Sequence, residues 1–158
     1  KVIFVGSKNE AQAIIKETAN SLGMPYVTTR WIGGTLTNFS EIKKRITKLS
    51  KMMADVEKGE YAKFNKKERL DLDKQIIKLQ KHYTGLLTLT ELPKAIVVVD
   101  SKAEAIAVKE ANDINIPVIS LSNTDCDVTT ISHPVIANDA SVGSITYFIT
   151  KLADAASK

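Results

Sequence analysis

Cysteine, tryptophan and long apolar runs are scarce in this sequence. Cys126 is the only cysteine among 158 residues, which excludes a disulfide bond within the chain, and no Cys/His cluster has the spacing of a structural zinc site. No apolar run approaches the roughly 20 residues of a membrane-spanning helix, and no basic stretch followed by an apolar one resembles a leader peptide. We therefore expect a cytosolic protein with no membrane partner. Because the chain begins at Lys1 without Met, we also expect a further segment upstream.

Motifs for catalysis are missing as well. His82 and His133 are the only histidines, and neither stands in a Ser/His/Asp pattern. The turn at residues 5–10 lacks the glycine spacing of nucleotide-binding loops, although a backbone turn that precedes a helix can bind an anion. We predict no catalytic residue, no cofactor and no small-molecule substrate.

Three aspartates, Asp100, Asp125 and Asp127, lie in loops that follow predicted strands. Open parallel sheets bind ligands at the carboxyl ends of their strands, so these acids, together with Cys126 or His133, are candidates for a metal site. Acidic residues in loops before helices more often cap the helix. We therefore predict helix caps and no metal.

Apolar strands alternate with amphipathic helices at both ends of the sequence. Residues 95–99, AIVVV, are apolar on both faces, as is typical of a central strand in a parallel sheet. Five strands joined by crossover helices predict an α/β fold, a flavodoxin-like three-layer sandwich with a five-stranded parallel sheet in the order 2-1-3-4-5. The predicted strands are 2–5, 26–28, 95–99, 117–121 and 135–136, and the predicted helices are 10–22, 102–112 and 141–156.

Residues 40–84 interrupt this alternation with two helical seams. Apolar residues recur at i, i+4 and i+7 in each half of the segment. Two seams joined by a short turn predict an antiparallel coiled-coil hairpin, inserted into a body made of residues 1–39 and 85–158. The seams are Ile42, Ile46, Leu49, Met53 and Val56 in the first helix, and Leu72, Ile76, Leu79 and Tyr83 in the second.

Turn residues support the hairpin. Gly59 lies in the polar connection between the seams. Asn65 and Glu68 have the spacing of a capping box at the start of the second helix, and Gly85 is expected to cap the end of that helix.

The hairpin carries the positive charge of the chain. Residues 41–83 contain 13 Lys/Arg and seven Asp/Glu, a net charge of +6, so the rest of the chain is at −2 because the total is +4. At 100° per residue, two lysine stripes lie opposite the seams. This pattern favours a polyanionic partner, and a solvated helix face is the alternative. The stripes are Lys44, Lys48 and Lys51, then Lys74, Lys78 and Lys81.

The segment RWIGGTLTNF, residues 30–39, connects the sheet to the hairpin and contains the only tryptophan. Adjacent glycines permit backbone angles that other residues avoid, so we expect a structural elbow here. Arg30 and Trp31 have the chemistry to stack on a base or bind a phosphate, but packing at the root of the hairpin is the favoured role for Trp31. The elbow residues are Gly33, Gly34, Thr35, Asn38 and Phe39.

These motifs together resemble the bacterial-type ribosomal protein S2 family of the small subunit. The resemblance rests on RWIGGTLTNF and the basic hairpin after it, then on GLLTLTELPKAIVVVDSKAEAIAVKEANDINIPVISLSNTDCD and VIANDASVGSITYFITKLADA. It implies a flavodoxin-like body with an inserted coiled coil. It also implies a place on the back of the small subunit near the head, contacts with ribosomal RNA, and help in docking the large mRNA-binding ribosomal protein.

The sequence departs from the family pattern in two loops. Residues 123–128, NTDCDV, stand where relatives have Asp-Thr-Asn-Cys-Asp-Pro, and residues 138–143 lack the usual acidic pair followed by arginine. The family signature is matched at Arg30, Trp31, Gly33, Gly34, Thr35, Leu36, Thr37 and Asn38.

The main hypothesis is a non-catalytic protein of the cytoplasmic ribosome, whose partners are small-subunit ribosomal RNA and neighbouring ribosomal proteins. One alternative is an enzyme that binds a phosphosugar or nucleotide through Ser7, Lys8 and the strand-end acids. Another is a protein-interaction module that uses Leu70 and Ile77 on the hairpin. The candidate RNA-binding residues are Lys8, Arg30, Trp31, Lys43, Lys44, Arg45, Lys48, Lys51, Lys74, Lys78 and Lys81.

Overall fold

In the computed structural model, which describes residues 1–156, five parallel strands form one sheet in the order β2-β1-β3-β4-β5. The predicted α/β fold and strand order are therefore confirmed. Phe4 pairs with Tyr26 on one side and with Val97 on the other, which places β1 in the interior of the sheet. The strands are β1 (Val2–Val5), β2 (Tyr26–Val27), β3 (Ala95–Val99), β4 (Val118–Ser122) and β5 (His133–Ile136).

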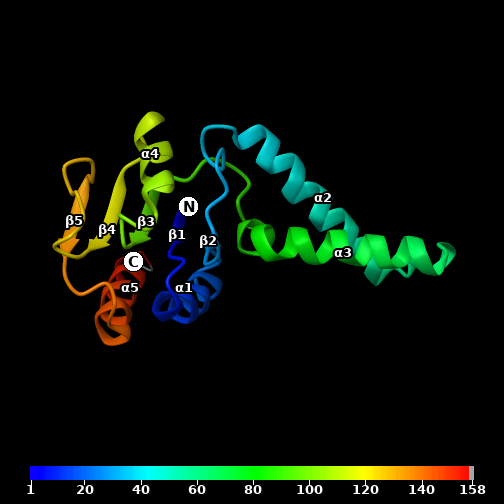
Figure 1. The fold of residues 1–158 in the computed structure, drawn as a ribbon. Helices are drawn as coiled ribbons and strands as arrows, with labels where there is room; N and C mark the ends of the chain where they lie inside the picture. The colour runs from blue at the N-terminus through cyan, green and yellow to red at the C-terminus, as the bar shows by residue number, and fades with distance from the viewer. Residues whose placement is uncertain (157–158) are drawn as a thin grey trace.

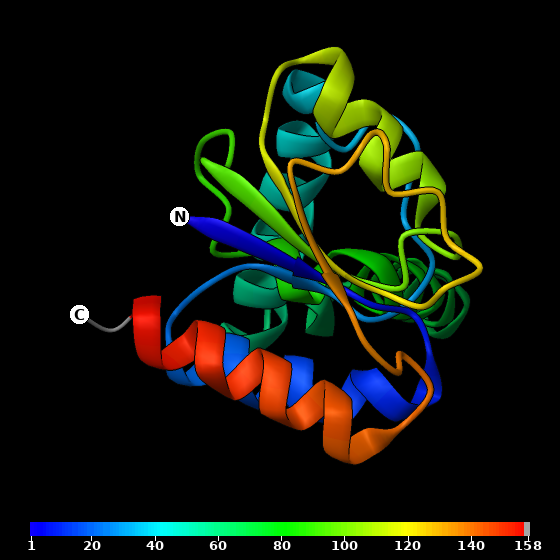
Figure 2. The same ribbon diagram turned by 90° about the vertical axis from the view of Figure 1, so that its left-hand side faces the viewer.

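Helices cover both faces of this sheet (Figures 1 and 2). α1 (Asn9–Ser21) and α5 (Val142–Ala156) lie together on one face. α4 (Ala105–Asp113) lies on the opposite face, beside the root of the hairpin. Among residues 1–156, none of the helices combines the length and the apolar character that crossing a bilayer requires.

The apolar residues of the central strands belong to two separate hydrophobic cores, one on each face of the sheet. Ile3 and Ile96 belong to the core beneath α4 and the hairpin root, whereas Phe4 and Val97 belong to the core beneath α1 and α5. Successive strand residues point to opposite faces, so a strand covered on both faces needs an unbroken apolar run. This is why AIVVV and VIFV appear in the sequence without polar alternation.

The hairpin consists of α2 (Phe39–Glu57), a short 3-10 helix (Glu60–Lys63) and α3 (Lys66–Tyr83). It projects away from the sheet in Figure 1. Its capping box is confirmed, since Oδ1 of Asn65 accepts the N–H of Glu68 at 2.9 Å and the Glu68 carboxylate accepts the N–H of Asn65 at 3.0 Å.

The first seam is buried mainly at the root of the hairpin. Ile42, Ile46 and Leu49 belong to the same core as the sheet residues, whereas Val56, near the tip, is 47% exposed. Much of the seam of α2 therefore packs on the body as well as on α3. The helical hairpin is confirmed, while regular coiled-coil packing between its helices stays a prediction.

Gly85 does not cap α3 as predicted. The residue after α3 is Thr84, which has right-handed helical angles, and the chain continues into a 3-10 turn at Thr84–Leu86. A Cβ atom on Gly85 would lie 2.2 Å from the carbonyl oxygen of Tyr26. Glycine is needed here because the root of the hairpin packs directly on the backbone of edge strand β2.

Candidate nucleic-acid interface

The carboxylate of Glu110 holds the RWIGGTLTNF segment in place. Glu110 lies in α4 and is 7% exposed. Its Oε1 accepts the Trp31 indole N–H at 3.2 Å and the Gly34 N–H at 2.7 Å. Its Oε2 accepts the Leu36 N–H at 2.9 Å and, at 3.4 Å, the Thr37 N–H. A buried carboxylate is tolerated only when it is well hydrogen-bonded, so Glu110 and the segment stabilise each other.

The elbow residues surround this carboxylate. Gly34 has φ of +87°, in the region that favours glycine, which turns the chain toward Glu110. The Thr35 hydroxyl donates to the carbonyl of Ile32 at 2.6 Å. Asn38 precedes α2 and makes no side-chain cap, and Phe39 begins α2 and packs partly buried against the core. The exposed Gly33 completes the turn.

Trp31 and Arg30 are adjacent but lie in different environments. Trp31 is 4% exposed and belongs to the core beneath α4, so its ring faces are covered by protein. Arg30 is exposed and lines a cleft of about 360 Å³ together with Ser7, Gln12 and Ile106. Of the two, only Arg30 is accessible to a nucleic acid.

The predicted RNA-binding cations of the hairpin are all exposed. Nζ of Lys43 donates to the carbonyl of Thr90 at 3.1 Å, and Nζ of Lys44 pairs with Glu41 at 2.6 Å. The other six form no ion pair within residues 1–156, so their charge is not neutralised by the chain itself. These six are Arg45, Lys48, Lys51, Lys74, Lys78 and Lys81.

Two large apolar side chains lie among these cations. Leu70 and Ile77 of α3 are 52% and 65% exposed, so neither packs on the body. Spaced seven residues apart, they share a helix face with Lys74 and Lys81. This mixed apolar and cationic face is open to a partner.

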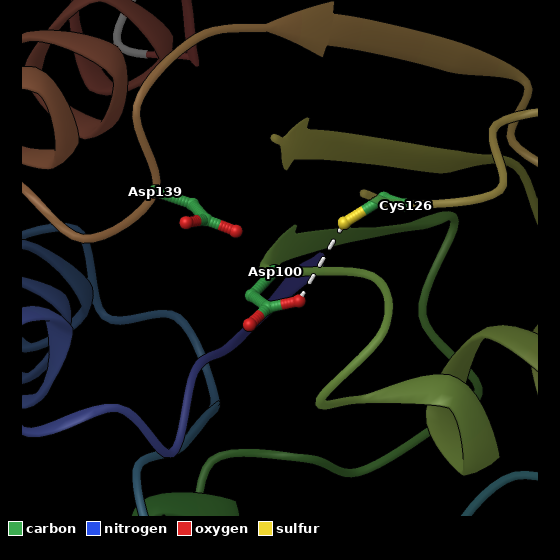
Figure 3. A group of neighbouring side chains, drawn as sticks. All are labelled: Asp100, Cys126 and Asp139. Atoms are coloured by element: carbon green, nitrogen blue, oxygen red, sulfur yellow. Dashed lines mark hydrogen bonds between the residues drawn. The ribbon is translucent and has the colours of Figure 1, made fainter. Parts of the chain in front are cut away.

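Lys8 lies in an internal ion cluster instead of on an open surface. Its Nζ lies 2.7 Å from Oδ2 of Asp100 and 3.1 Å from Oδ1 of Asp139. Figure 3 shows Asp100 and Asp139 with Cys126, whose thiol donates to Oδ1 of Asp100 at 3.7 Å. That oxygen also accepts the N–H groups of Lys102 and Ala103, each at 3.0 Å. Asp100 thus holds the turn that leads into α4, but it does not cap the helix itself, because the residue before α4 is Glu104, which makes no side-chain cap.

The ion cluster shifts the pKa values of Lys8 and Asp100 in opposite directions. Burial alone would lower the pKa of Lys8, but its hydrogen bonds to Asp100 and Asp139 outweigh burial and raise it above 10.5. Burial alone would raise the pKa of Asp100, but Lys8 and the backbone N–H groups outweigh burial and lower it below 3.8. Both groups are therefore charged across the neutral range.

The other candidate metal ligands do not join this cluster. Asp125 pairs with Lys102 at 3.0 Å, and Asp127 accepts the Thr129 N–H at 2.9 Å. His133 is exposed on β5. Ligand atoms of Asp100, Cys126 and Asp139 do lie within 4.8 Å of one another, but the Lys8 ammonium already bridges the two carboxylates. The arrangement favours an internal ion pair over a bound metal ion.

Sequence reasoning did not identify Glu110 or Glu104. Glu104 is 4% exposed, and its Oε1 accepts the Ser7 N–H at 2.8 Å. The available signal was the position of both glutamates near the apolar side of α4, beside Ala107 and Ala111. An acidic residue on the buried side of a helix implies a hydrogen-bonding partner, which the sequence alone did not identify.

Comparison with known proteins places this arrangement in a family. Residues 1–158 match the family described as ribosomal protein S2. The chain belongs to the ribosomal protein S2 family. This family is made of structural ribosomal proteins and not of enzymes, which overturns the enzyme alternative. The Ser7 N–H and the Lys8 ammonium on which that alternative depended are bonded within the fold.

Curated relatives of the S2 family align with almost the entire chain. The proteins named small ribosomal subunit protein uS2 from Roseiflexus sp. (strain RS-1) and Coprothermobacter proteolyticus are 45% and 42% identical over 156 and 154 residues. The one from Petrotoga mobilis is 41% identical over 155 residues. These alignments cover 98–99% of this chain but only 54–60% of the relatives. The chain therefore spans somewhat more than half the length of the S2 proteins it matches.

Proposed function

We propose that this chain is a structural component of the small subunit of the cytoplasmic ribosome and binds ribosomal RNA through the exposed cations of its hairpin. The observation that carries the proposal is the concentration of +6 net charge on a projecting element. Lysine and arginine in such an array bind phosphates by charge and position the protein without reading sequence. The S2 family and its named ribosomal relatives support the same role.

The residues proposed for RNA contact differ from the sequence prediction at two positions. Lys8 is left out because its ammonium is bonded to Asp100 and Asp139. Trp31 is left out because its ring is buried. The proposed contacts are Arg30, Lys43, Lys44, Arg45, Lys48, Lys51, Lys74, Lys78 and Lys81.

A neighbouring small-subunit ribosomal protein is the second proposed partner. Leu70 and Ile77 provide exposed apolar area on α3, and apolar side chains on an open helix face are typical of protein contacts. Docking of the large mRNA-binding ribosomal protein, which the family resemblance implies, is one such contact. Changing Leu70 and Ile77 to Glu should abolish binding of the neighbouring protein. The same change should lower RNA affinity by less than the replacement of two hairpin lysines does.

Sedimentation of the tagged full-length protein in a cell lysate tests the main proposal. We expect the protein to migrate with small subunits, and we expect a variant with Lys48, Lys51 and Lys78 changed to Gln to shift toward the light fractions at moderate salt. Recovery of the unchanged protein only in the light soluble fractions contradicts the proposal.

A further inference from the structure

A small polar hollow lies where the hairpin root meets edge strand β2. Its volume is about 210 Å³, and its walls come from α1, β2 and the C-terminal end of α3. None of the residues that line it is acidic. We call it the root hollow, and the four lining residues that matter below are Lys16, Thr28, Lys81 and His82.

Backbone geometry directs an N–H group toward this hollow. The carbonyl groups of Pro25 and Val27 accept the N–H groups of Phe4 and Gly6, each at 3.0 Å, so these two residues face β1. Backbone groups of successive strand residues alternate in direction. The N–H of Thr28 therefore points to the open edge of the sheet, where the root hollow lies.

Two lysines from different elements border the same space. Lys16 belongs to α1 and Lys81 to α3, and within residues 1–156 neither forms an ion pair. The Thr29 hydroxyl donates to the carbonyl of Lys81 at 3.2 Å, which holds the end of α3 against the loop after β2. Two lysines that are far apart in the sequence are thus brought to one hollow by the fold.

His82 supplies an independent observation. Its Nδ1 is the only buried side-chain nitrogen or oxygen without a hydrogen-bond partner in the described part of the chain. Buried polar atoms are nearly always bonded, and an exception points to a missing ion, water or ligand. His82 lines the root hollow, so this unbonded ring nitrogen belongs to a residue at its wall.

We propose that the root hollow binds one phosphodiester group of RNA. The proposal rests on the proposed function. Lys74 and Lys78 continue the cationic face of α3 from Lys81 toward the tip of the hairpin, so an RNA strand that follows this face reaches the root hollow. The volume lies below the roughly 300–1,000 Å³ of sites for drug-sized ligands, so it suits a backbone phosphate better than a whole nucleotide. Lys16, Thr28 and His82 are thereby added to the RNA contacts.

The test compares two variants of the full-length protein in binding to a small-subunit ribosomal RNA transcript. Lys16→Gln, which changes the one lysine of the root hollow that lies outside the hairpin, should reduce the slope of log affinity against log salt by about one, the share of one lost phosphate contact. Lys109→Gln removes an exposed lysine of α4 that does not line the root hollow, and it should leave the slope unchanged. Far-UV circular dichroism establishes that all three proteins are equally folded.

A second readout follows the root hollow directly. In ¹⁵N NMR spectra, titration with the dinucleotide UpU should shift the Thr28 amide and the His82 ring nitrogens saturably, and uridine, which lacks the phosphate, should not. Equal slopes for Lys16→Gln and Lys109→Gln, with both NMR signals unmoved, overturn the root hollow. Salt-dependent RNA binding by the unchanged protein then leaves the proposed function standing. If the unchanged protein shows no salt-dependent RNA binding, the proposed function fails, and the response to UpU still decides the root hollow.

Discussion

The body and the hairpin use charged residues in opposite ways. Each of the buried acids that the structure describes, Asp100, Glu104, Glu110 and Asp139, lies in the body and is bonded within the fold. Every lysine and arginine of the hairpin is exposed. Buried charge in the body thus holds loops in place, whereas the hairpin exposes its lysines and arginines, several of which we propose to bind RNA. This difference predicts which substitutions damage folding and which damage binding.

The largest expected loss of stability comes from Glu110→Ala. The substitution leaves the N–H groups of Trp31, Gly34 and Leu36 buried without an acceptor, which costs about 3 kcal/mol or more in the free energy of unfolding. Chemical denaturation measures it. Asp113→Ala, at an exposed position of the same helix, is the control and should stay within about 0.5 kcal/mol. Similar values for both would show that the body does not depend on this carboxylate.

Two adjacent isoleucines sharpen the comparison within the hairpin. Ile76 is 8% exposed and Ile77 is 65% exposed. Ile76→Ala should cost about 2–3 kcal/mol because it leaves a cavity in the seam, whereas Ile77→Ala should change stability by less than about 0.5 kcal/mol. Thermal or urea unfolding of the two variants measures both losses of stability. An equal loss would mean that the outer face of α3 is packed in the free protein.

Two glycines make a matched pair at the ends of the hairpin. Gly85→Ala places a methyl group against the Tyr26 carbonyl, and the forced displacement should cost about 2 kcal/mol. Gly59→Ala, at φ of +69° with no atom within 4 Å of the new Cβ, should cost about 1 kcal/mol from backbone strain alone. The difference in unfolding midpoint measures how tightly the root packs on β2. The two variants will have equal unfolding midpoints if the root of the hairpin can move away from β2.

The Lys8 cluster predicts the smallest effect, of about 1 kcal/mol, and it depends on pH. Because the pKa of folded Asp100 is below 3.8, its stabilising contribution is full above that value and is lost as pH falls through the folded pKa. The raised pKa of Lys8 keeps the pair intact until the solution is more alkaline than 10.5. Lys8→Met should therefore move the acid loss of stability to higher pH, measured by urea unfolding between pH 7 and pH 2. Lys109→Met should not change the pH at which stability is lost. If stability falls with pH in the same way for both variants, the ion cluster does not stabilise the fold.

The sequence was sufficient to predict the features that depend on neighbouring residues. Residues 95–99 identified a central strand because a strand covered on both faces must be apolar throughout. Asn65 and Glu68 identified the start of α3 because both halves of a capping box lie within one turn. The excess of lysine in residues 41–83 is likewise a property of one continuous segment, and its role in RNA binding stays a prediction.

The features that sequence reasoning missed join residues far apart in the chain. Glu110 bonds Gly34 across 76 positions, and an acidic residue in a helix is ordinarily a solvated one. Lys8 was assigned to RNA because its partner Asp139 lies at the other end of the chain. Gly85 was predicted as a cap because its contact with Tyr26 depends on how two elements pack. Local sequence patterns therefore predict the helices and strands, whereas the contacts of the elbow can be identified only from the folded structure.

The most direct test of this division is the salt dependence of binding to a small-subunit ribosomal RNA transcript, with two triple variants compared. One carries Gln at Lys48, Lys51 and Lys78 of the hairpin, and the other carries Gln at Lys94, Lys109 and Lys151, three exposed lysines of the body. If the hairpin supplies the phosphate contacts, its variant loses about 2–3 units of slope, at roughly 0.7–0.9 for each of three contacts, and the body variant keeps the original slope. Equal slopes for the two variants would contradict the account.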